Sequence, residues 1–220
     1  MKRSLVCAGI AALALLGIPI QATAANLLTN PGFENPVLAG GDTFGAIGWS
    51  VFGDGTYTIK LAPHSGDNAF KTFGQTSGAF QDFTAAPGQS WQGSAWILNP
   101  SFDAMAGAQI ATANIEWHDA GGNLISFIPS VPQITSATPV GSDTAGYTFV
   151  TTSGIAPPGT ATARFVLLTG AFSGSGGGAP YFDDASFEQL VPEPAALTLM
   201  AIAATCFAAC RRQRREPSMP

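Results

Sequence analysis

Turn-forming residues divide the chain between residues 25 and 190 into short runs, and this spacing constrains the fold more than any other feature of the sequence. Glycine, serine, threonine, asparagine and proline recur so often that no segment keeps the 3.6-residue period of an amphipathic helix. The runs that predict strands are Tyr57–Leu61, Ala79–Phe83, Ser90–Leu98, Ala111–His118, Leu124–Ile128, Tyr147–Thr152, Thr162–Thr169 and Tyr181–Leu190. Eight or more short strands predict an all-β fold, a two-sheet antiparallel sandwich.

The turns between these runs have recognisable chemistry. Ala86-Pro87-Gly88 and Pro157-Pro158-Gly159 each precede a predicted strand, and Asp119–Asn123 predicts a hairpin. We interpret Ser173–Gly178, which contains only serine and glycine, as a flexible loop. It lies within the domain and does not end it, because a strand that must complete the sheet follows it.

The first 24 residues have the layout of a secretory signal peptide. Met1-Lys2-Arg3 is basic, Ser4 to Ile20 is mostly apolar, and Ala22-Thr23-Ala24 has small residues at the two positions that define a cleavage site. Cleavage after Ala25 fits nearly as well. The sequence therefore predicts export and removal of residues 1–24.

The other end of the chain predicts a short membrane segment. The apolar run Ala195–Cys210 has 16 residues, which as a helix span roughly 24 Å against a hydrocarbon core of about 30 Å. Four arginines follow it, Arg211, Arg212, Arg214 and Arg215. By the positive-inside rule they stay in the cytoplasm, so residues upstream of Val191 are expected outside.

With Val191-Pro192-Glu193-Pro194 directly before the apolar run, residues 191–215 resemble the PEP-CTERM sorting signal of exported bacterial proteins. The resemblance implies a membrane transpeptidase-like protease of the exosortase type as a partner, with cleavage near Pro194. It also implies a Gram-negative host that produces polysaccharide. Before processing the chain is then membrane-anchored through its C-terminal helix, and afterwards it is at the cell surface or extracellular. A permanent single-span anchor is the alternative.

Residues 25–190 are expected to form one domain. They number 166, enough for one well-cored domain and too few for two comfortable ones. The three cysteines, Cys7, Cys206 and Cys210, all lie outside this segment. No disulfide can therefore hold the domain, although the predicted compartment is oxidising.

The charge of this segment limits its partners. Between residues 25 and 190 there are three basic residues, Lys60, Lys71 and Arg164, against twelve acidic ones, a formal net charge of −9. A surface for nucleic acid or for an anionic membrane is excluded by this balance. Acidity of this kind suits a soluble extracellular protein or one that binds calcium.

No catalytic motif stands out in the sequence. It contains two histidines, and it lacks a Gly-x-Ser-x-Gly elbow, a His-Glu-x-x-His pair and a phosphate-binding loop. Pairs of carboxylates occur, as in any sequence with twelve acids, but a glycosidase needs two at a defined separation that sequence does not show. We therefore expect a protein that is not an enzyme.

Four segments together look like the galactose-binding-like jelly roll of carbohydrate-binding modules. They are residues 26–34 (NLLTNPGFE), 86–96 (APGQSWQGSAW), 115–123 (IEWHDAGGN) and 181–187 (YFDDASF). Their order along the chain matches the family and spans nearly the whole domain. The resemblance implies a jelly-roll sandwich, and it implies less about function because one fold serves many ligands.

The same resemblance implies a structural calcium, Ca2+, held by an acid near the start of the domain and an acid in its last strand. The matching positions are Glu34 and the pair Asp183 and Asp184. Strand alternation places Asp183 on one face with Ala185 and Phe187, so if those two face the core, Asp183 points inward. A buried carboxylate needs a metal or another partner, and loop amides or Arg164 are the alternatives to calcium.

For sugar binding we consider a groove lined by Trp96, Gln92, Glu116, His118 and Arg164. Alternation in Ser90–Leu98 places Gln92 and Trp96 on one face, and the same alternation pairs Glu116 with His118. Aromatic rings and side-chain amides are the usual groups that contact sugars. The alternative is that the tryptophans fill the core.

The sequence thus predicts an exported, non-enzymatic protein of the cell surface or extracellular matrix that binds a glycan of the envelope or matrix. Two alternatives stay open: a structural or adhesive protein without sugar affinity, and an enzyme that acts on glycosides.

Overall fold

The computed structural model describes residues 25–53 and 55–190, and the predicted signal peptide and sorting tail lie outside them. The described chain consists of strands joined by turns, with one short 3-10 turn, Thr144–Gly146. The strands are β1 Asp42–Phe44, β2 Ser50–Phe52, β3 Gly55–Ile59, β4 Ala69–Phe73, β5 Thr76–Thr84, β6 Ser90–Leu98, β7 Ala106–Gly107, β8 Ile110–His118, β9 Leu124–Pro129, β10 Ile134–Thr135, β11 Tyr147–Ile155, β12 Thr162–Gly170, β13 Gly176–Gly177 and β14 Tyr181–Leu190. Within the described ranges, no helix is long and apolar enough to cross a membrane.

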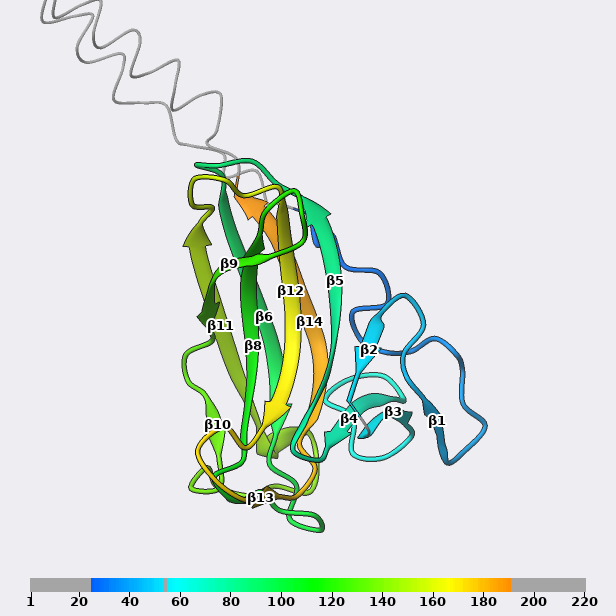
Figure 1. The fold of residues 1–220 in the computed structure, drawn as a ribbon. Helices are drawn as coiled ribbons and strands as arrows, with labels where there is room; N and C mark the ends of the chain where they lie inside the picture. The colour runs from blue at the N-terminus through cyan, green and yellow to red at the C-terminus, as the bar shows by residue number, and fades with distance from the viewer. Residues whose placement is uncertain (1–24, 54, 191–220) are drawn as a thin grey trace, which may run out of the picture. The chain divides into compact units, whose positions relative to one another are not determined.

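Two antiparallel sheets face each other (Figure 1). Sheet A has the strand order β1-β3-β4-β14-β6-β11, and sheet B has the order β10-β8-β12-β5-β2 with β9 paired to β8. A separate two-stranded ribbon joins β13 to β7. The predicted all-β, two-sheet antiparallel sandwich is confirmed.

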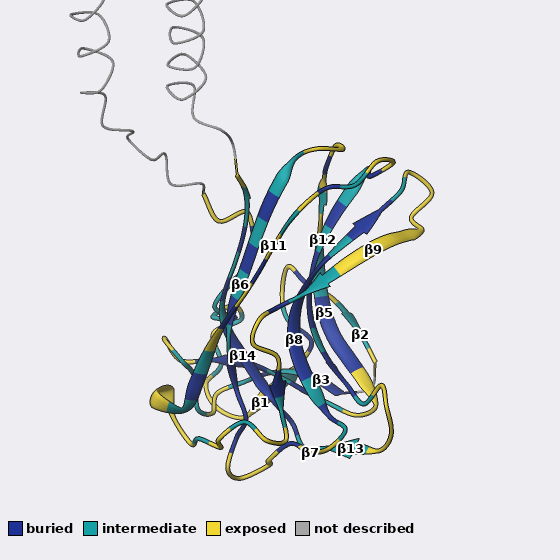
Figure 2. Ribbon diagram, turned by 90° about the vertical axis from the view of Figure 1, so that its left-hand side faces the viewer, coloured by how far each residue is buried: buried dark blue, intermediate teal, exposed yellow. Residues whose placement is uncertain are grey.

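The core lies between the sheets, where Figure 2 shows buried residues on both layers. Alternate residues of the long strands supply it, for example Trp91, Ala95 and Ile97 of β6, all of them fully or almost fully buried. The Phe187 ring stacks on Trp91 at 5.0 Å and on Phe165 at 5.1 Å between ring centroids. Each large side chain buried here contributes about 1.5–3 kcal/mol to stability.

Strand β14 contains a β-bulge that changes the face of the sheet on which its later side chains lie. Its register against β6 shifts between Asp183 and Ser186, and Asp184 has a left-handed φ of 43°. Phe182, Ala185 and Phe187 therefore all reach the core between the sheets. The prediction that Asp183 shares a face with Ala185 and Phe187 is wrong, because strict alternation does not continue through a bulge.

Hydrogen bonds tie the first described residues to the last strand. The Leu27 N–H donates to the Phe187 carbonyl at 2.8 Å, and the Asn26 amide donates to the Ala185 carbonyl at 2.9 Å. The core and all the strands described above lie between these two ends. Residues 25–190 thus form a unit with its own core and with both ends secured, and it can be studied as a separate fragment.

Candidate functional site

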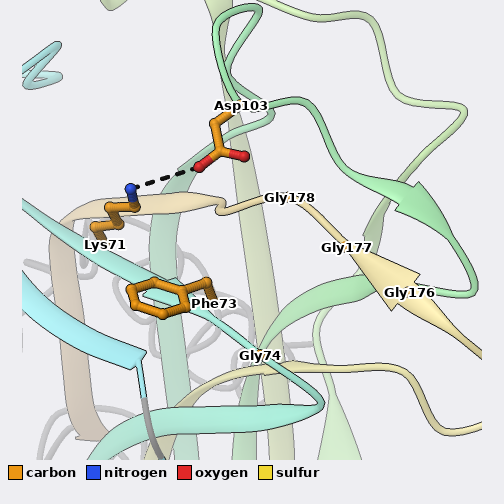
Figure 3. Close-up of a pocket in the computed structure, with 7 residues that line it drawn as sticks. All are labelled: Lys71, Phe73, Gly74, Asp103, Gly176, Gly177 and Gly178. Carbon is orange, nitrogen blue, oxygen red and sulfur yellow. Dashed lines mark ion pairs between the residues drawn. The ribbon is translucent and has the colours of Figure 1, made fainter.

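A cavity of about 330 Å³ opens at the outer face of sheet A, the face turned away from the sandwich core (Figure 3). Its size is at the lower end of the range of roughly 300–1,000 Å³ usual for ligand pockets. The residues that line it come from β4, from the loop after β6 and from the segment around β13. They are Lys71, Phe73, Gly74, Asp103, Gly176, Gly177 and Gly178.

Strand β4 presents two of these side chains on the same face. Lys71 and Phe73 alternate with Phe70 and Thr72, which are fully buried on the side of the core. The Phe73 ring lies against Gly55 of the neighbouring strand β3, where a Cβ atom would be 2.5 Å from the ring. A glycine at position 55 is therefore required for the ring to occupy this place.

The opposite wall of the cavity is peptide backbone. Gly176 and Gly177 form β13, so the predicted flexible loop is partly a strand. Gly178 has a φ of 87°, and a Cβ atom there would collide with the Ala104 carbonyl. At Gly177, in contrast, a Cβ atom would meet nothing within 4 Å, so this residue faces open space.

One ion pair crosses the cavity. Lys71 Nζ lies 3.5 Å from Asp103 Oδ2 and 5.4 Å from the centroid of the Phe73 ring. The Lys71 side chain is 22% exposed and that of Asp103 is 46% exposed, so solvent and a ligand can reach both. Burial, and next the charge of Asp103, raise the pKa of the neighbouring Tyr181 hydroxyl to about 12.

A buried amide supports the cavity from behind. Gln109 is fully buried and donates from Nε2 to the Gly74 carbonyl at 3.1 Å. Its Oε1 has no hydrogen-bond partner among the described residues and lies directly against Gly176. The cavity thus offers one aromatic ring, one cationic donor, one carboxylate acceptor and a wall of peptide groups.

The five residues predicted to line a sugar groove do not lie together. Gln92 and Trp96 are on the outer face of sheet A, because they alternate with the core residues of β6. Trp96 packs between His64, at 4.1 Å, and Phe149, at 5.1 Å between ring centroids. It is partly buried and contributes to a small apolar cluster there.

Glu116, His118 and Arg164 are on the outer face of sheet B, across the sandwich from Gln92 and Trp96. Glu116 is directly opposite Arg164 in the register of β8 and β12, and its carboxylate is 3.1 Å from His118 Nε2. Arg164 makes two hydrogen bonds to Asp82, at 2.6 and 2.9 Å, and lies over the Phe80 ring at 3.8 Å. A single groove formed by all five predicted residues does not exist in this fold.

Asp183, one of the predicted metal ligands, is fully buried but on the outer face of sheet A, opposite Trp96. Its Oδ2 accepts hydrogen bonds from the N–H groups of His64, at 2.8 Å, and Ser65, at 3.2 Å. Loop amides therefore satisfy this carboxylate, whereas Arg164, the other alternative to calcium, lies on sheet B. Burial, and next the charge of Asp184, raise the pKa of Asp183 to about 7, against the pull of these N–H donors.

The other two predicted ligands also accept hydrogen bonds from protein groups. Asp184 Oδ2 lies 2.7 Å from His64 Nδ1, and the Ser65 hydroxyl donates to Asp184 Oδ1 at 2.8 Å. The Glu34 carboxylate accepts from the N–H groups of Asp67 and Asn68 and is turned toward them.

Calcium binding stays a prediction. Both aspartates have an oxygen near Gly32, where a Cβ atom would be 3.4 Å from Asp184 Oδ1 and 3.7 Å from Asp183 Oδ1. In residues 25–53 and 55–190, no three His, Cys, Asp or Glu side chains converge closely enough to hold a metal. The hard oxygen donors of the aspartate pair fit calcium, whereas Glu34 would have to give up its amide contacts to join them.

No protein-family model matches the chain, and no curated protein matches it. Solved structures do match. A cyclase from Fischerella sp. TAU, in complex with 4-(1H-indol-3-yl)butan-2-one, is 13% identical with a TM-score of 0.57, over 78% of this chain and 100% of the cyclase chain. The enzymatically active domain of bacteriophage CBA120 tailspike protein 4 is 16% identical with a TM-score of 0.51, over 75% of this chain and 21% of that chain.

A carbohydrate-binding module, TmCBM61 in complex with β-1,4-galactotriose, is 16% identical over 76% of this chain and 100% of the module, with a TM-score of 0.47. At identities this low, the cyclase and the tailspike domain share a fold with this chain, and their activities do not carry over to it.

None of the residues that line this cavity, Lys71 included, was predicted from the sequence as a site residue. Lys71 and Phe73 belong to a short strand that was not predicted, and Asp103 lies in a loop. The one available signal was the glycine run before the last strand, since glycine is also used where backbone must approach a ligand closely.

Proposed function

We propose that this is an exported, non-enzymatic protein of the cell surface or extracellular matrix that binds a neutral polysaccharide in the cavity beside Lys71. One observation carries the proposal. The Phe73 ring, the Lys71–Asp103 pair and the bare backbone of Gly176–Gly178 all line the same cavity.

This lining suits a sugar ring. The apolar face of a pyranose can stack on Phe73, while its hydroxyl groups both donate and accept hydrogen bonds. Lys71 Nζ can donate to a sugar oxygen and Asp103 can accept from a hydroxyl, and they are held 3.5 Å apart. Glycine peptides without side chains let the ring approach the backbone closely.

The charges favour a neutral sugar. Lys71 and Asp103 cancel within the cavity, while residues 25–190 as a whole have three basic and twelve acidic residues. An anionic polymer is repelled by such a domain at low salt, and salt screens the repulsion only partly. We expect a Kd of roughly 10 µM to 1 mM for one site, so that retention on a polymer depends on several copies binding at once.

The two ends of the sequence support the proposed location of the protein outside the cell. The signal-peptide pattern of residues 1–24 supports export, and the PEP-CTERM-like segment 191–215 supports sorting by an exosortase-type protease in a polysaccharide-producing cell. A polysaccharide of the cell envelope or matrix is therefore the proposed partner. A structural calcium at Asp183 and Asp184 is a further part of the proposal and is independent of the cavity.

Binding of residues 25–190 to immobilised neutral and uronic-acid-rich polysaccharides, across a salt series, tests the function. Gly177→Ala adds one methyl group to the open wall of the cavity, and Gly40→Ala makes the same change where a Cβ atom also meets nothing within 4 Å. We expect Phe73→Ala and Gly177→Ala to weaken binding to neutral polymers at least tenfold, and Gly40→Ala to leave it unchanged.

Glu116→Gln on sheet B is a second control, which we expect to bind like the unmodified domain. Failure to bind any neutral polymer, or tight binding to anionic polymers that weakens with salt in a chelator, would refute the proposal. Loss of binding in Glu116→Gln together with normal binding in Gly177→Ala would place the site on the other sheet.

A further inference from the structure

Three aromatic side chains form a row along the outer face of sheet A, from its edge to the cavity beside Lys71. This aromatic row consists of Phe44 on β1, Tyr57 on β3 and Phe73 on β4. The Phe44 and Tyr57 rings meet edge to face at 5.7 Å, and the Tyr57 and Phe73 rings are nearly parallel at 5.9 Å between centroids.

The strand register explains the row. Phe44 is directly opposite Tyr57, and Gly55 is directly opposite Phe73, so the three rings belong to neighbouring positions on one face of the sheet. The side of the sheet that packs into the core is supplied by other residues, such as Thr56 and Thr58, which are fully buried.

Both ends of the aromatic row line a cavity. Phe73 lines the cavity of about 330 Å³ that contains Lys71. Phe44 lines a second cavity of about 300 Å³, together with Ile47, Trp49 and Val51, where the edge strands β1 and β2 of the two sheets end the sandwich. The row therefore connects two hollows in the surface.

The row is accessible along its length. Phe44 is 61% exposed, and Tyr57 and Phe73 are both partly exposed. The described residues leave most of Phe44 uncovered, and its contact with the other two rings makes a contiguous apolar strip, the kind of patch that marks an interaction site. A ligand that stacks on it would remove this apolar surface from solvent.

We infer that the site takes an internal stretch of a linear neutral polysaccharide, several sugar units long, which runs across the aromatic row from one cavity to the other. The inference rests on the proposed function and adds the class of ligand. Successive sugar units contact successive rings, because the apolar face of a pyranose can pack against an aromatic side chain, by its face or its edge. Affinity therefore rises with chain length until the row is filled, and a free chain end is not needed.

The test is calorimetry of residues 25–190 with neutral oligosaccharides of one to six units in four β-1,4-linked series, namely galactose, glucose, xylose and mannose. We expect Kd to fall at least tenfold between two and six units in the series that binds. Phe44→Ala should lose this gain, with at least tenfold weaker binding of six units and less than twofold change for two units.

Phe149→Ala is the matched control. Phe149 is also an exposed phenylalanine (46%) on an edge strand of sheet A, and its ring also contacts an aromatic neighbour, Trp96. It lies on β11 at the opposite edge of the sheet from β1. We expect this variant to bind both lengths normally.

Several outcomes would overturn the inference. One such outcome is equal affinity for two and six units, with Phe73→Ala binding neither length. It would leave the proposed function intact and restrict the ligand to a chain end or a single unit. Normal binding of six units by Phe44→Ala, with loss of self-association in sedimentation, would assign Phe44 to a contact between copies of the chain. If no length binds in any series and no polymer binds either, the proposed function itself fails.

Discussion

The rings of Tyr57 and Phe73 lie almost parallel, with 6° between their planes and 5.9 Å between their centroids. This arrangement depends on Gly55, the residue of β3 that is directly opposite Phe73. Without a side chain at position 55, the Phe73 ring can lie flat over the strand beside Tyr57. One glycine thus sets the position of the ring that we propose to contact sugar.

The first prediction concerns this glycine. In Gly55→Ala the new Cβ atom would be 2.5 Å from the Phe73 ring, so the ring must move. Overpacking of this kind typically costs about 1–3 kcal/mol of stability, and we expect weaker binding of neutral polysaccharide as well. Urea denaturation and a binding assay measure the two effects.

Gly40→Ala is the control for this change, because a Cβ atom there meets nothing within 4 Å. We expect its stability to stay within about 0.5 kcal/mol of the unmodified domain. Normal stability and normal binding in Gly55→Ala would show that the Phe73 ring does not need this glycine.

The second prediction concerns pH. Burial raises the pKa of Asp183 to about 7 from the ordinary aspartate value of 3.8. Between these values the folded protein keeps a proton that the unfolded chain has released, so stability falls as pH rises through this window. The effect is at most about 4 kcal/mol, because each pKa unit corresponds to about 1.4 kcal/mol.

Urea denaturation in chelator from about pH 4 to about pH 8 measures this slope. Asp183→Asn replaces the protonated carboxyl by an amide of the same shape, whose oxygen can still accept from the N–H groups of His64 and Ser65. Because this amide does not titrate, the stability of the variant should decline less over this range. The same slope in both proteins would mean that Asp183 does not take up a proton on folding.

The third prediction concerns calcium. If Asp183 and Asp184 hold the ion, millimolar calcium should raise the melting temperature of residues 25–190. The gain is about 2.7 kcal/mol at a hundredfold excess over Kd. Asp183→Asn should lose this response, and Asp42→Asn, a change at an exposed edge strand, should keep it. Identical melting in chelator and in millimolar calcium would exclude the site.

The fourth prediction concerns the tail. Processing near Pro194 would leave a mature protein without residues 195–220. Intact-mass measurement of protein recovered from its native host should therefore give a mass without this segment. Recovery of most molecules with the full tail through Pro220 would favour a permanent membrane anchor.

How much of the fold was predictable depended on strand length. Strands such as β6 and β8, with nine residues each, show clear alternation and were predicted almost to the residue. Strands β1, β7, β10 and β13 have two or three residues, too few to show any period. Strands β1 and β10 form because longer neighbours, β3 and β8, offer free hydrogen-bonding groups, and β7 and β13 pair with each other; both are tertiary effects.

The candidate site was less predictable for a related reason. Lys71, Asp103 and Gly177 are far apart in sequence, and none belongs to a motif with a fixed spacing. Asp183 is buried, as predicted, but it lies on the opposite face of its strand from the predicted one. The reason is the β-bulge between Asp183 and Ser186, which residue types do not reveal. The predicted groove failed because alternation assigns a residue to a face of its own strand and does not say which sheet that strand joins.

The hydrogen bonds from Asn26 and Leu27 to Ala185 and Phe187 have a practical consequence for engineering. Because the first residues of the domain are hydrogen-bonded to its last strand, the two ends of the domain lie close together. Such a unit can be spliced into an exposed turn of an unrelated carrier protein without forcing the flanks of that turn apart. The same proximity allows a short bridge to join residues 25 and 190 in a circular permutant with new ends in the β8–β9 hairpin turn.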